Sequence, residues 1–421
     1  MKSKGLTGSR IQGFKGKGTS NKPNKPNEGK GMAPLTCRGF TASGMAAGIK
    51  NNGNLDLGLL VSDRPARVAA VFTKNRVQAA PVKLDRERVK SGTARAVIVN
   101  AGNANCANGP QGLVAASAMA ASAARVLNVP DDQVLVASTG VIGAPFPIQK
   151  VEAAMPALAG GLNPNGVPDL ARAIMTTDTR PKTGARESSV DGVPYRIVAV
   201  AKGAGMIRPD MATMLCFICT DADISLSDLQ SALKRSVDGS FNRITIDGDS
   251  STNDTVILMA NGASGARIET DADRVDFQRL LDDLCMDLAR QMVKDGAGVT
   301  KVVDLTVCGA RCDADARAIA DTIAHSPLVK TAFFGEDANW GRIIAAAGRA
   351  GVFLDPERLD LYFDDVQMVR NGTGCGPDAE EKATGVLRKP EFSVTLDLNL
   401  GQGRAAILTC DFSLDYVKIN A

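Results

Sequence analysis

The sequence predicts a mixed α+β protein built in layers. Short apolar runs, some alternating and some continuous, are typical of strands, and they are separated by segments in which apolar residues recur with helical spacing. Some strands are expected to be joined through helices and others through tight turns, a combination typical of α+β folds. The chain has 421 residues. That length corresponds to roughly two or three domain-sized units and is enough to bury a large core.

The first 33 residues differ in composition from the rest. They hold seven lysines and Arg10 against one acid, Glu28, a net charge of +7, whereas the remaining 41 basic and 45 acidic residues sum to −4. Residues 1–33 are rich in glycine and almost free of apolar side chains, so we expect a disordered basic tail. Signal-peptide and transit-peptide features are missing, and no apolar run approaches the roughly 20 residues of a membrane helix. The sequence therefore indicates a cytoplasmic protein that binds neither membranes nor nucleic acid.

The body of the chain predicts strands and helices in alternation. Apolar runs predict strands at 96–100, 133–137, 196–201 and 214–219. Helical spacing predicts helices over 113–127, 226–237, 277–292 and 313–324. Near the end, strict alternation over 392–400, a Gly-Gln-Gly turn and an apolar run at 405–410 predict a half-buried antiparallel hairpin. The most linker-like stretches are 160–166 and a polar loop over 371–388.

A single histidine and nine scattered cysteines exclude several kinds of site. Sites with two or three histidine ligands cannot be built, and a histidine base could come only from His325, which we expect to be structural. The cysteines are odd in number and follow no secretion signal, so reduced thiols are expected. Cys216 and Cys219 lie three residues apart on a predicted strand and therefore on opposite faces. They are poor chelating partners, and we predict core cysteines and no metal.

Three segments are more polar and richer in glycine than core packing requires: 138–143, 202–213 and 240–255. The first follows a strand, so its backbone N–H groups could bind a phosphate or an oxyanion, although a plain tight turn explains it equally well. The third carries Asp247 and Asp254, but their spacing does not match a calcium loop. We interpret the third segment as a polar loop that supports an active site.

The second segment ends at Thr213, directly before an apolar strand. A threonine in this position suits an activated hydroxyl, although a β-branched residue opening a strand is the simpler interpretation. A nucleophile also needs a base, and histidine is nearly absent. Cleavage of the Ala212–Thr213 bond would supply one, because it frees an α-amine with a pKa of about 7.7–8.0. The nearby Lys202 ammonium would lower that pKa, because like charges disfavour protonation.

Four long motifs lie at 202–214 (KGAGMIRPDMATM), 240–255 (SFNRITIDGDSSTNDT), 326–342 (SPLVKTAFFGEDANWGR) and 416–420 (YVKIN). Through them the chain resembles the bifunctional ornithine acetyltransferase / glutamate N-acetyltransferase family of arginine biosynthesis, from about Gly39 to Ala421. The resemblance implies a layered α/β/β/α sandwich of the self-cleaving N-terminal-threonine-nucleophile type. It also implies self-cleavage at Ala212–Thr213 into an α chain, 34–212, and a β chain, 213–421, which assemble as a heterotetramer of two α and two β chains.

The same resemblance implies a ping-pong reaction without a cofactor. Thr213 would attack the acetyl group of N-acetylornithine, and the acetyl-enzyme would then pass the group to glutamate. The family's oxyanion hole corresponds to Thr139 and Gly140, and its substrate contacts correspond to Thr176, Lys202, Thr213 and Asn420. Whether acetyl-CoA also serves as an acetyl donor stays open.

Two departures from the family's pattern concern the substrate side. Ala297 stands where the family usually has a glutamate that contacts substrate, and the chain ends at Ala421, a few residues before the family's usual terminal serine or threonine. Two alternatives stay open. One is a self-processed N-terminal-nucleophile amidohydrolase or aminopeptidase of related fold, in which water is the acceptor. The other is a non-catalytic relative that only binds amino acids.

Overall fold

The largest sheet has eight strands among residues 34–208 and 214–420, the residues that the computed structural model describes. Its order is β4-β3-β2-β9-β7-β6-β5, with β1 paired to the first part of β2. The strands are β1 (Phe40–Met45), β2 (Leu57–Phe72), β3 (Thr93–Asn103), β4 (Val134–Val141), β5 (Lys182–Val190), β6 (Val193–Lys202), β7 (Leu215–Thr220) and β9 (Thr255–Ala260).

Strand β2 belongs to both halves of this sheet. Its first part pairs with β3 and its last part with β9, and the register with β3 shifts between Val61 and Ala66. The two halves of the sheet face each other across one apolar cluster. Val97 and Leu135, from β3 and β4, lie in the same cluster as Phe217 of β7. The sheet is therefore folded into two layers.

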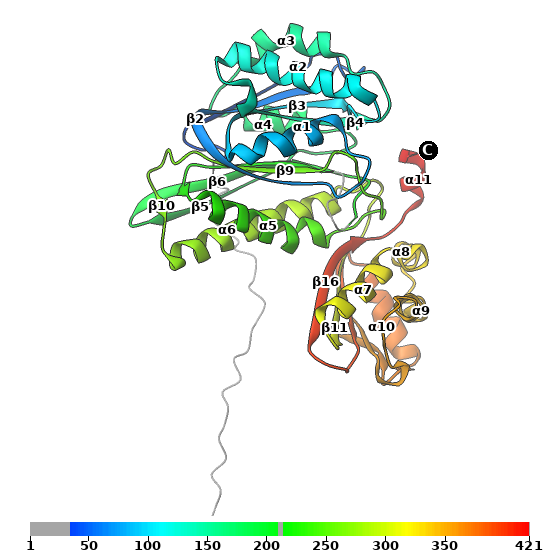
Figure 1. The fold of residues 1–421 in the computed structure, drawn as a ribbon. Coiled ribbons are helices and arrows are strands. Elements are labelled where there is room, and N and C mark those ends of the chain that lie inside the picture. Colours follow the sequence, from blue (N-terminus) through cyan, green and yellow to red (C-terminus); the bar gives the residue numbers. More distant parts are fainter. Residues whose placement is uncertain (1–33, 209–213, 421) are drawn as a thin grey trace, which may run out of the picture. The chain divides into compact units, whose positions relative to one another are not determined.

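Helices cover the outer face of each layer (Figure 1). The β2–β4 half is covered by α2 (Gly109–Leu127) and α3 (Ile148–Gly160), and α1 (Ala80–Arg88) lies along the edge strand β4, where Asp85 accepts the N–H of Val136. The other half is covered by α5 (Leu226–Gly239) and α6 (Asp271–Lys294). The short α4 (Val167–Ala173) contributes to the apolar cluster between the two layers. The order helix, sheet, sheet, helix confirms the predicted α/β/β/α sandwich.

Strand β7 illustrates why this layering follows from the sequence. All six of its residues are buried, because helices cover one face and the second layer covers the other. Cys216 lies in the cluster beneath α5 and α6, and Cys219 lies in the cluster between the layers. The two thiols thus occupy opposite faces, as predicted, and burial raises the pKa of Cys216.

A second sheet of six strands lies in the described C-terminal residues, in the order β14-β13-β12-β15-β11-β16. Its core includes buried side chains of the surrounding helices. The elements are β11 (Val302–Ala310), α7 (Asp313–Ala324), α8 (Pro327–Phe334), α9 (Trp340–Gly348), β12 (Asp360–Phe363), β13 (Val366–Arg370), β14 (Thr373–Gly374), α10 (Pro377–Leu387), β15 (Glu391–Asp397) and β16 (Gly403–Cys410). A third, two-stranded sheet pairs β8 (Asp223–Ile224) with β10 (Arg267–Ile268), and the last helix is α11 (Leu414–Asn420).

Two sequence-based expectations are wrong in this C-terminal part. The predicted hairpin does not form, because β11 lies between β15 and β16, parallel to the first and antiparallel to the second. An apolar strand about 80 residues earlier in the chain thus takes both partners, which no local turn signal reveals. The stretch 371–388 is not a polar loop, since it contains β14 and α10. No helix in the described ranges is long and apolar enough to cross a membrane.

Candidate functional site

A cavity of about 430 Å³ lies where β4, β6 and α11 approach one another. Five residues that the sequence analysis assigns to the site line it: Thr139, Gly140, Thr176, Lys202 and Asn420. The other two, Ala212 and Thr213, lie outside the described residues. The register of the sheet pairs Lys202 with Leu215, the second residue after Thr213. The start of β7 is therefore beside the lysine.

Lys202 is the last residue of β6 and is 2% exposed. Its Nζ donates hydrogen bonds to Oγ1 of Thr139, at 3.0 Å, and to Oγ1 of Thr176, at 2.7 Å. Burial lowers the pKa of Lys202, the Asp178 carboxylate acts in the opposite direction, and the Lys182 ammonium lowers it further. One buried ammonium thus joins the predicted oxyanion-hole threonine to the predicted substrate-binding threonine.

Behind Lys202 lies a buried ion cluster that the sequence analysis does not predict. Lys182 Nζ lies 2.6 Å from Asp178 Oδ1 and 2.5 Å from Asp295 Oδ2, and all three side chains are buried. Asp178 also accepts the backbone N–H groups of Thr176 and Gly203. Burial alone would raise the pKa of Asp178, but Lys202, Lys182 and these hydrogen bonds lower it to about 2. The cluster holds the loop that carries Thr176 against the end of β6.

Thr139 and Gly140 lie within β4 and not in a loop after it, because parallel pairing with β3 continues through both. Gly140 pairs with Gly102 and has a φ of +133°, which only glycine adopts without strain. A Cβ at Gly140 would lie 2.3 Å from the carbonyl carbon of Gly102. Backbone freedom and close approach thus both require glycine beside Thr139.

The three glycine-rich polar segments of the sequence meet at this cavity. Lys202, from the second segment, bonds Thr139 of the first. Asn253, from the third, donates through Nδ2 to the carbonyl of Ser138, at 2.8 Å. Asp247, also from the third, accepts the N–H groups of Met206 and Ile207 in the second, at 2.7 and 2.8 Å. The third segment therefore supports the other two with side-chain hydrogen bonds.

Asp254 holds the first described residue after Thr213. Its Oδ1 accepts the N–H of Met214 at 3.0 Å, and the carbonyl of Met214 accepts the N–H of Thr255 at 3.1 Å. The carboxyl is fully buried, and burial raises its pKa, although the Met214 N–H acts in the opposite direction. Its Oδ2 has no hydrogen-bond partner among the described residues. Met214 is thus held through both its N–H and its carbonyl group.

The C-terminal helix closes one side of the cavity. Tyr416 donates its hydroxyl to Asp247 Oδ2 at 3.2 Å, and Asn420 Nδ2 donates to the carbonyl of Tyr416 at 2.9 Å. Burial, with the Asp247 carboxylate nearby, raises the pKa of Tyr416 to about 12.

Ala297 donates its N–H to the carbonyl of Ala204 on the cavity wall, so the substitution noted in the sequence lies next to the site.

His325 has both ring nitrogens occupied by structural contacts. Its Nδ1 lies 2.7 Å from the carbonyl of Asp321, and its Nε2 lies 3.0 Å from Oγ1 of Thr245. Burial lowers its pKa, and the residue does not line the cavity. Among residues 34–208 and 214–420, no cluster of three or more histidine, cysteine or acidic residues could hold a metal ion.

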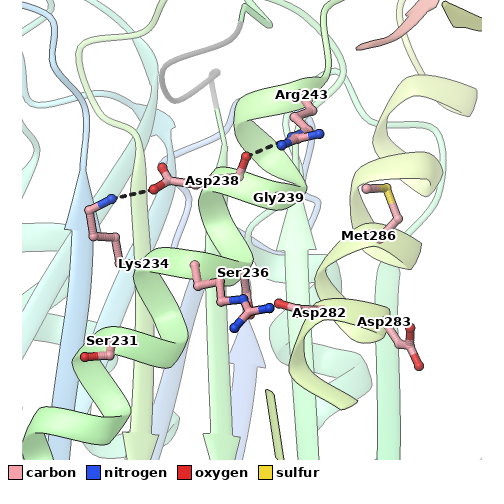
Figure 2. Close-up of a pocket in the computed structure, with 10 residues that line it drawn as sticks. Ser231, Lys234, Ser236, Asp238, Gly239, Arg243, Asp282, Asp283 and Met286 are labelled. Carbon is pink, nitrogen blue, oxygen red and sulfur yellow. Dashed lines mark hydrogen bonds and ion pairs between the residues drawn. The ribbon is translucent and has the colours of Figure 1, made fainter. Parts of the chain in front are cut away.

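A second depression lies between α5 and α6 (Figure 2). Its lining includes Lys234 and Asp238, which form an ion pair on α5, and Arg243, which donates to the Asp238 carbonyl. None of the predicted site residues lies there. The Lys234–Asp238 pair lies at an exposed surface, where such pairs contribute little to stability.

Comparison with known proteins gives a consistent picture. The model of the ArgJ family matches residues 41–421. The arginine biosynthesis bifunctional protein ArgJ of Geobacter sulfurreducens is 52% identical over 389 residues, which cover 92% of this chain and 99% of that protein. The protein of the same name from Syntrophotalea carbinolica is 49% identical over 385 residues, 91% of this chain and 98% of that one. A crystal structure of ArgJ from Bacillus halodurans is 40% identical, covers 48% of this chain and 97% of its own, and has a TM-score of 0.46.

Proposed function

The chain belongs to the ArgJ family, and from that premise we propose that it is an acyltransferase that moves an acetyl group from N-acetylornithine to glutamate in arginine biosynthesis. One structural observation carries the proposal. The buried Lys202 ammonium joins Thr139 and Thr176 at a cavity wall, and in the sheet it pairs with Leu215 at the start of β7. A buried cation beside hydroxyl groups suits a reaction in which an amide carbonyl becomes an oxyanion.

The proposed chemistry begins with cleavage of the Ala212–Thr213 bond, which frees the α-amine of Thr213. This amine takes the proton of the Thr213 hydroxyl while the oxygen attacks the acetyl carbon of N-acetylornithine. The oxyanion is stabilised at Thr139 and Gly140. The carbon–nitrogen bond then breaks, the proton passes to the departing nitrogen, and ornithine leaves an acetyl ester on Thr213. The amine of glutamate attacks that ester and regenerates the hydroxyl.

Thr176, Lys202 and Asn420 contact the substrate, and the reaction needs no cofactor. The size of the cavity and the polar side chains on its wall suit an amino acid derivative. We also propose that the cleaved chains, 34–212 and 213–421, assemble as a heterotetramer of two α and two β chains, and that the protein acts in the cytoplasm.

Purified protein incubated with N-acetylornithine and isotopically labelled glutamate tests the proposed activity. We expect label in N-acetylglutamate, at a rate proportional to enzyme, and no transfer by Thr213→Ala. A parallel reaction with acetyl-CoA as donor shows whether the enzyme has one acetylating activity or two. Acetate release without labelled product would show a hydrolase, and ornithine binding without turnover would show a non-catalytic protein; either result contradicts the proposal. Membership of the ArgJ family supports acetyl transfer over both the hydrolase and the non-catalytic protein.

A further inference from the structure

Lys50 is a second cation on the wall of the same cavity, and it lies outside the long family motifs. Its Nζ donates to the carbonyl of Leu55 at 2.6 Å, and no carboxylate in the described part of the chain forms an ion pair with it. An ammonium carries three donors, so two remain for a ligand. Burial lowers the pKa of Lys50, whereas the more distant Asp56 and Asp178 act in the opposite direction. A partly buried cation without a counter-ion is costly unless an anion binds it.

The backbone around Lys50 is held in place. Asp56 is fully buried, and its carboxylate accepts the N–H groups of Ala47, Ile49 and Lys50 at 2.6, 2.6 and 2.9 Å. Three charge-assisted hydrogen bonds donated to one carboxylate give this turn a defined geometry. The backbone at Lys50 is therefore fixed, and the hydrogen bond from its Nζ to the carbonyl of Leu55 holds the side chain at the cavity wall.

The stem of Lys50 packs beside the predicted oxyanion pair. A Cβ on Gly102 would lie 3.1 Å from Cγ of Lys50, so the lysine stem rests on Gly102. Gly102 in turn pairs with Gly140 and touches it closely. The stem of Lys50 is thus separated by one glycine from Gly140, where the acetyl carbonyl would be polarised.

The chemistry of the proposed reaction identifies the anion that the Lys50 ammonium would bind. Both substrates pass through one cavity, and their side chains end in opposite charges, an ammonium in N-acetylornithine and a carboxylate in glutamate. What they share is an α-carboxylate, one carbon away from the nitrogen that loses or gains the acetyl group. Resting on the proposed function, we propose that Lys50 binds the α-carboxylate of both substrates and so positions the reacting nitrogen.

Kinetics of Lys50→Met test this role. Loss of a charged hydrogen bond is expected to raise KM about tenfold to hundredfold for N-acetylornithine and by a similar factor for glutamate. Lys50→Arg, which keeps the positive charge, is expected to restore most of the affinity. Lys234→Met is the matched control, because its side chain is 75% exposed on α5 and outside the cavity. An increase of KM for only one substrate, or for neither, overturns the proposal.

Ligands that lack the α-carboxylate distinguish a loss of carboxylate binding from a general distortion of the protein. Calorimetry compares ornithine with putrescine, and glutamate with γ-aminobutyrate, on the wild-type protein and on Lys50→Met. We expect the wild type to prefer the carboxylated member of each pair, and Lys50→Met to lose about tenfold or more of that preference. A variant that is merely distorted weakens both members equally, and an unchanged preference contradicts the role of Lys50. If the wild type itself transfers no acetyl group, the proposed function fails instead.

Discussion

Single residues at this cavity act through burial and charge. Lys202 and Asp178 are both buried, and each shifts the pKa of the other in the direction that favours its charged form. The sequence identifies Lys202, because it lies in a long family motif. It gives no signal for Asp178 as an ion partner, because Lys182 and Asp295 join it only in the folded chain. A buried pair of this kind is costly to break from one side.

The pKa of Asp178 predicts a pH-dependent contribution to stability. It is lowered from 3.8 to about 2 in the folded protein, so its contribution is present above pH 3.8 and is lost as the pH falls towards 2. A shift of this size corresponds to about 2 kcal/mol. Asp178→Asn is therefore expected to be less stable than wild type at pH 6, with a difference that shrinks below pH 3.8. Thermal unfolding between pH 2 and 7 measures this.

The control for Asp178 is Asp169→Asn, which removes an exposed ion pair with Arg172. Exposed pairs contribute about 0–1 kcal/mol, so this variant should follow the wild-type curve. An equal stability loss for Asp178→Asn at pH 2 and pH 6 would contradict the assignment.

Gly140→Ala tests the close approach beside the predicted oxyanion hole. The new Cβ would meet Gly102 backbone at 2.3 Å, and φ of +133° adds strain. We expect about 1–3 kcal/mol of strain plus a similar cost of overpacking, together with a loss of acetyl transfer. Gly143→Ala is the matched control, because it has a positive φ of +82° but open space around its Cβ position. Calorimetric unfolding and initial-rate measurements should show that Gly140→Ala is less stable than Gly143→Ala and transfers acetyl groups more slowly.

At the scale of elements, alternation predicted burial well and predicted strand partners poorly. The pattern of β15 is half-buried as expected, yet its neighbours are β11 and β12. Local signals gave some helix limits and missed others: α7 spans Asp313–Ala324 as predicted, whereas α6 begins at Asp271 and not at 277. Partner choice depends on strands far away in the chain, and the turn residues between two strands do not encode it.

The link between the 240–255 segment and β4 also depends on one side chain. Asn253 donates through Nδ2 to the carbonyls of Ala104 and Ser138 at 2.6 and 2.8 Å, in a buried setting. Asn253→Ala leaves both carbonyls without this donor, at about 1–3 kcal/mol for each unsatisfied group. We expect lower stability and a lower kcat, because Thr139 follows Ser138 directly. Denaturant unfolding and steady-state kinetics measure both effects.

Asn75→Ala provides the comparison for Asn253. Its exposed Nδ2 donates to the carbonyl of Ser250, in the same loop, so this variant removes a bond where water can replace it. Its effect on stability should stay within about 0.5 kcal/mol. If both variants behaved alike, the proposed support of Thr139 by Asn253 would be wrong.

At the scale of the whole molecule, the two expected chains share one sheet. β7 and β9 come from the expected β chain, yet β7 pairs with β6 and β9 with β2, both from the expected α chain. Buried residues on either side of position 212 also share clusters, as Val198 and Ile257 do. All described residues belong to one compact unit. Cleavage at Ala212–Thr213 would therefore cut the backbone without dividing the core.

Mass measurement and gel filtration test this expectation together. Under denaturing conditions we expect two fragments, the smaller beginning at Thr213, and one uncut chain for Thr213→Ala. In native buffer the fragments should elute as one species, because backbone hydrogen bonds between β6 and β7 and buried apolar surface hold them together. An intact wild-type chain under denaturing conditions would contradict the proposed mechanism. Separate elution of the two fragments in native buffer would contradict a core shared between them.

Local patterns in the sequence predict the layered fold class, the limits of α7, the opposite faces of Cys216 and Cys219 and the family to which the chain belongs. These follow from local periodicity and from long motifs, which need no knowledge of distant contacts. Three features emerge only in the folded chain: β11 separates β15 from β16, Asp295 joins the Lys182–Asp178 pair, and Lys50 packs on Gly102, the partner of Gly140. Each of these depends on side chains or strands that are far apart in sequence, and folding brings them together through packing and charge rather than through any local pattern.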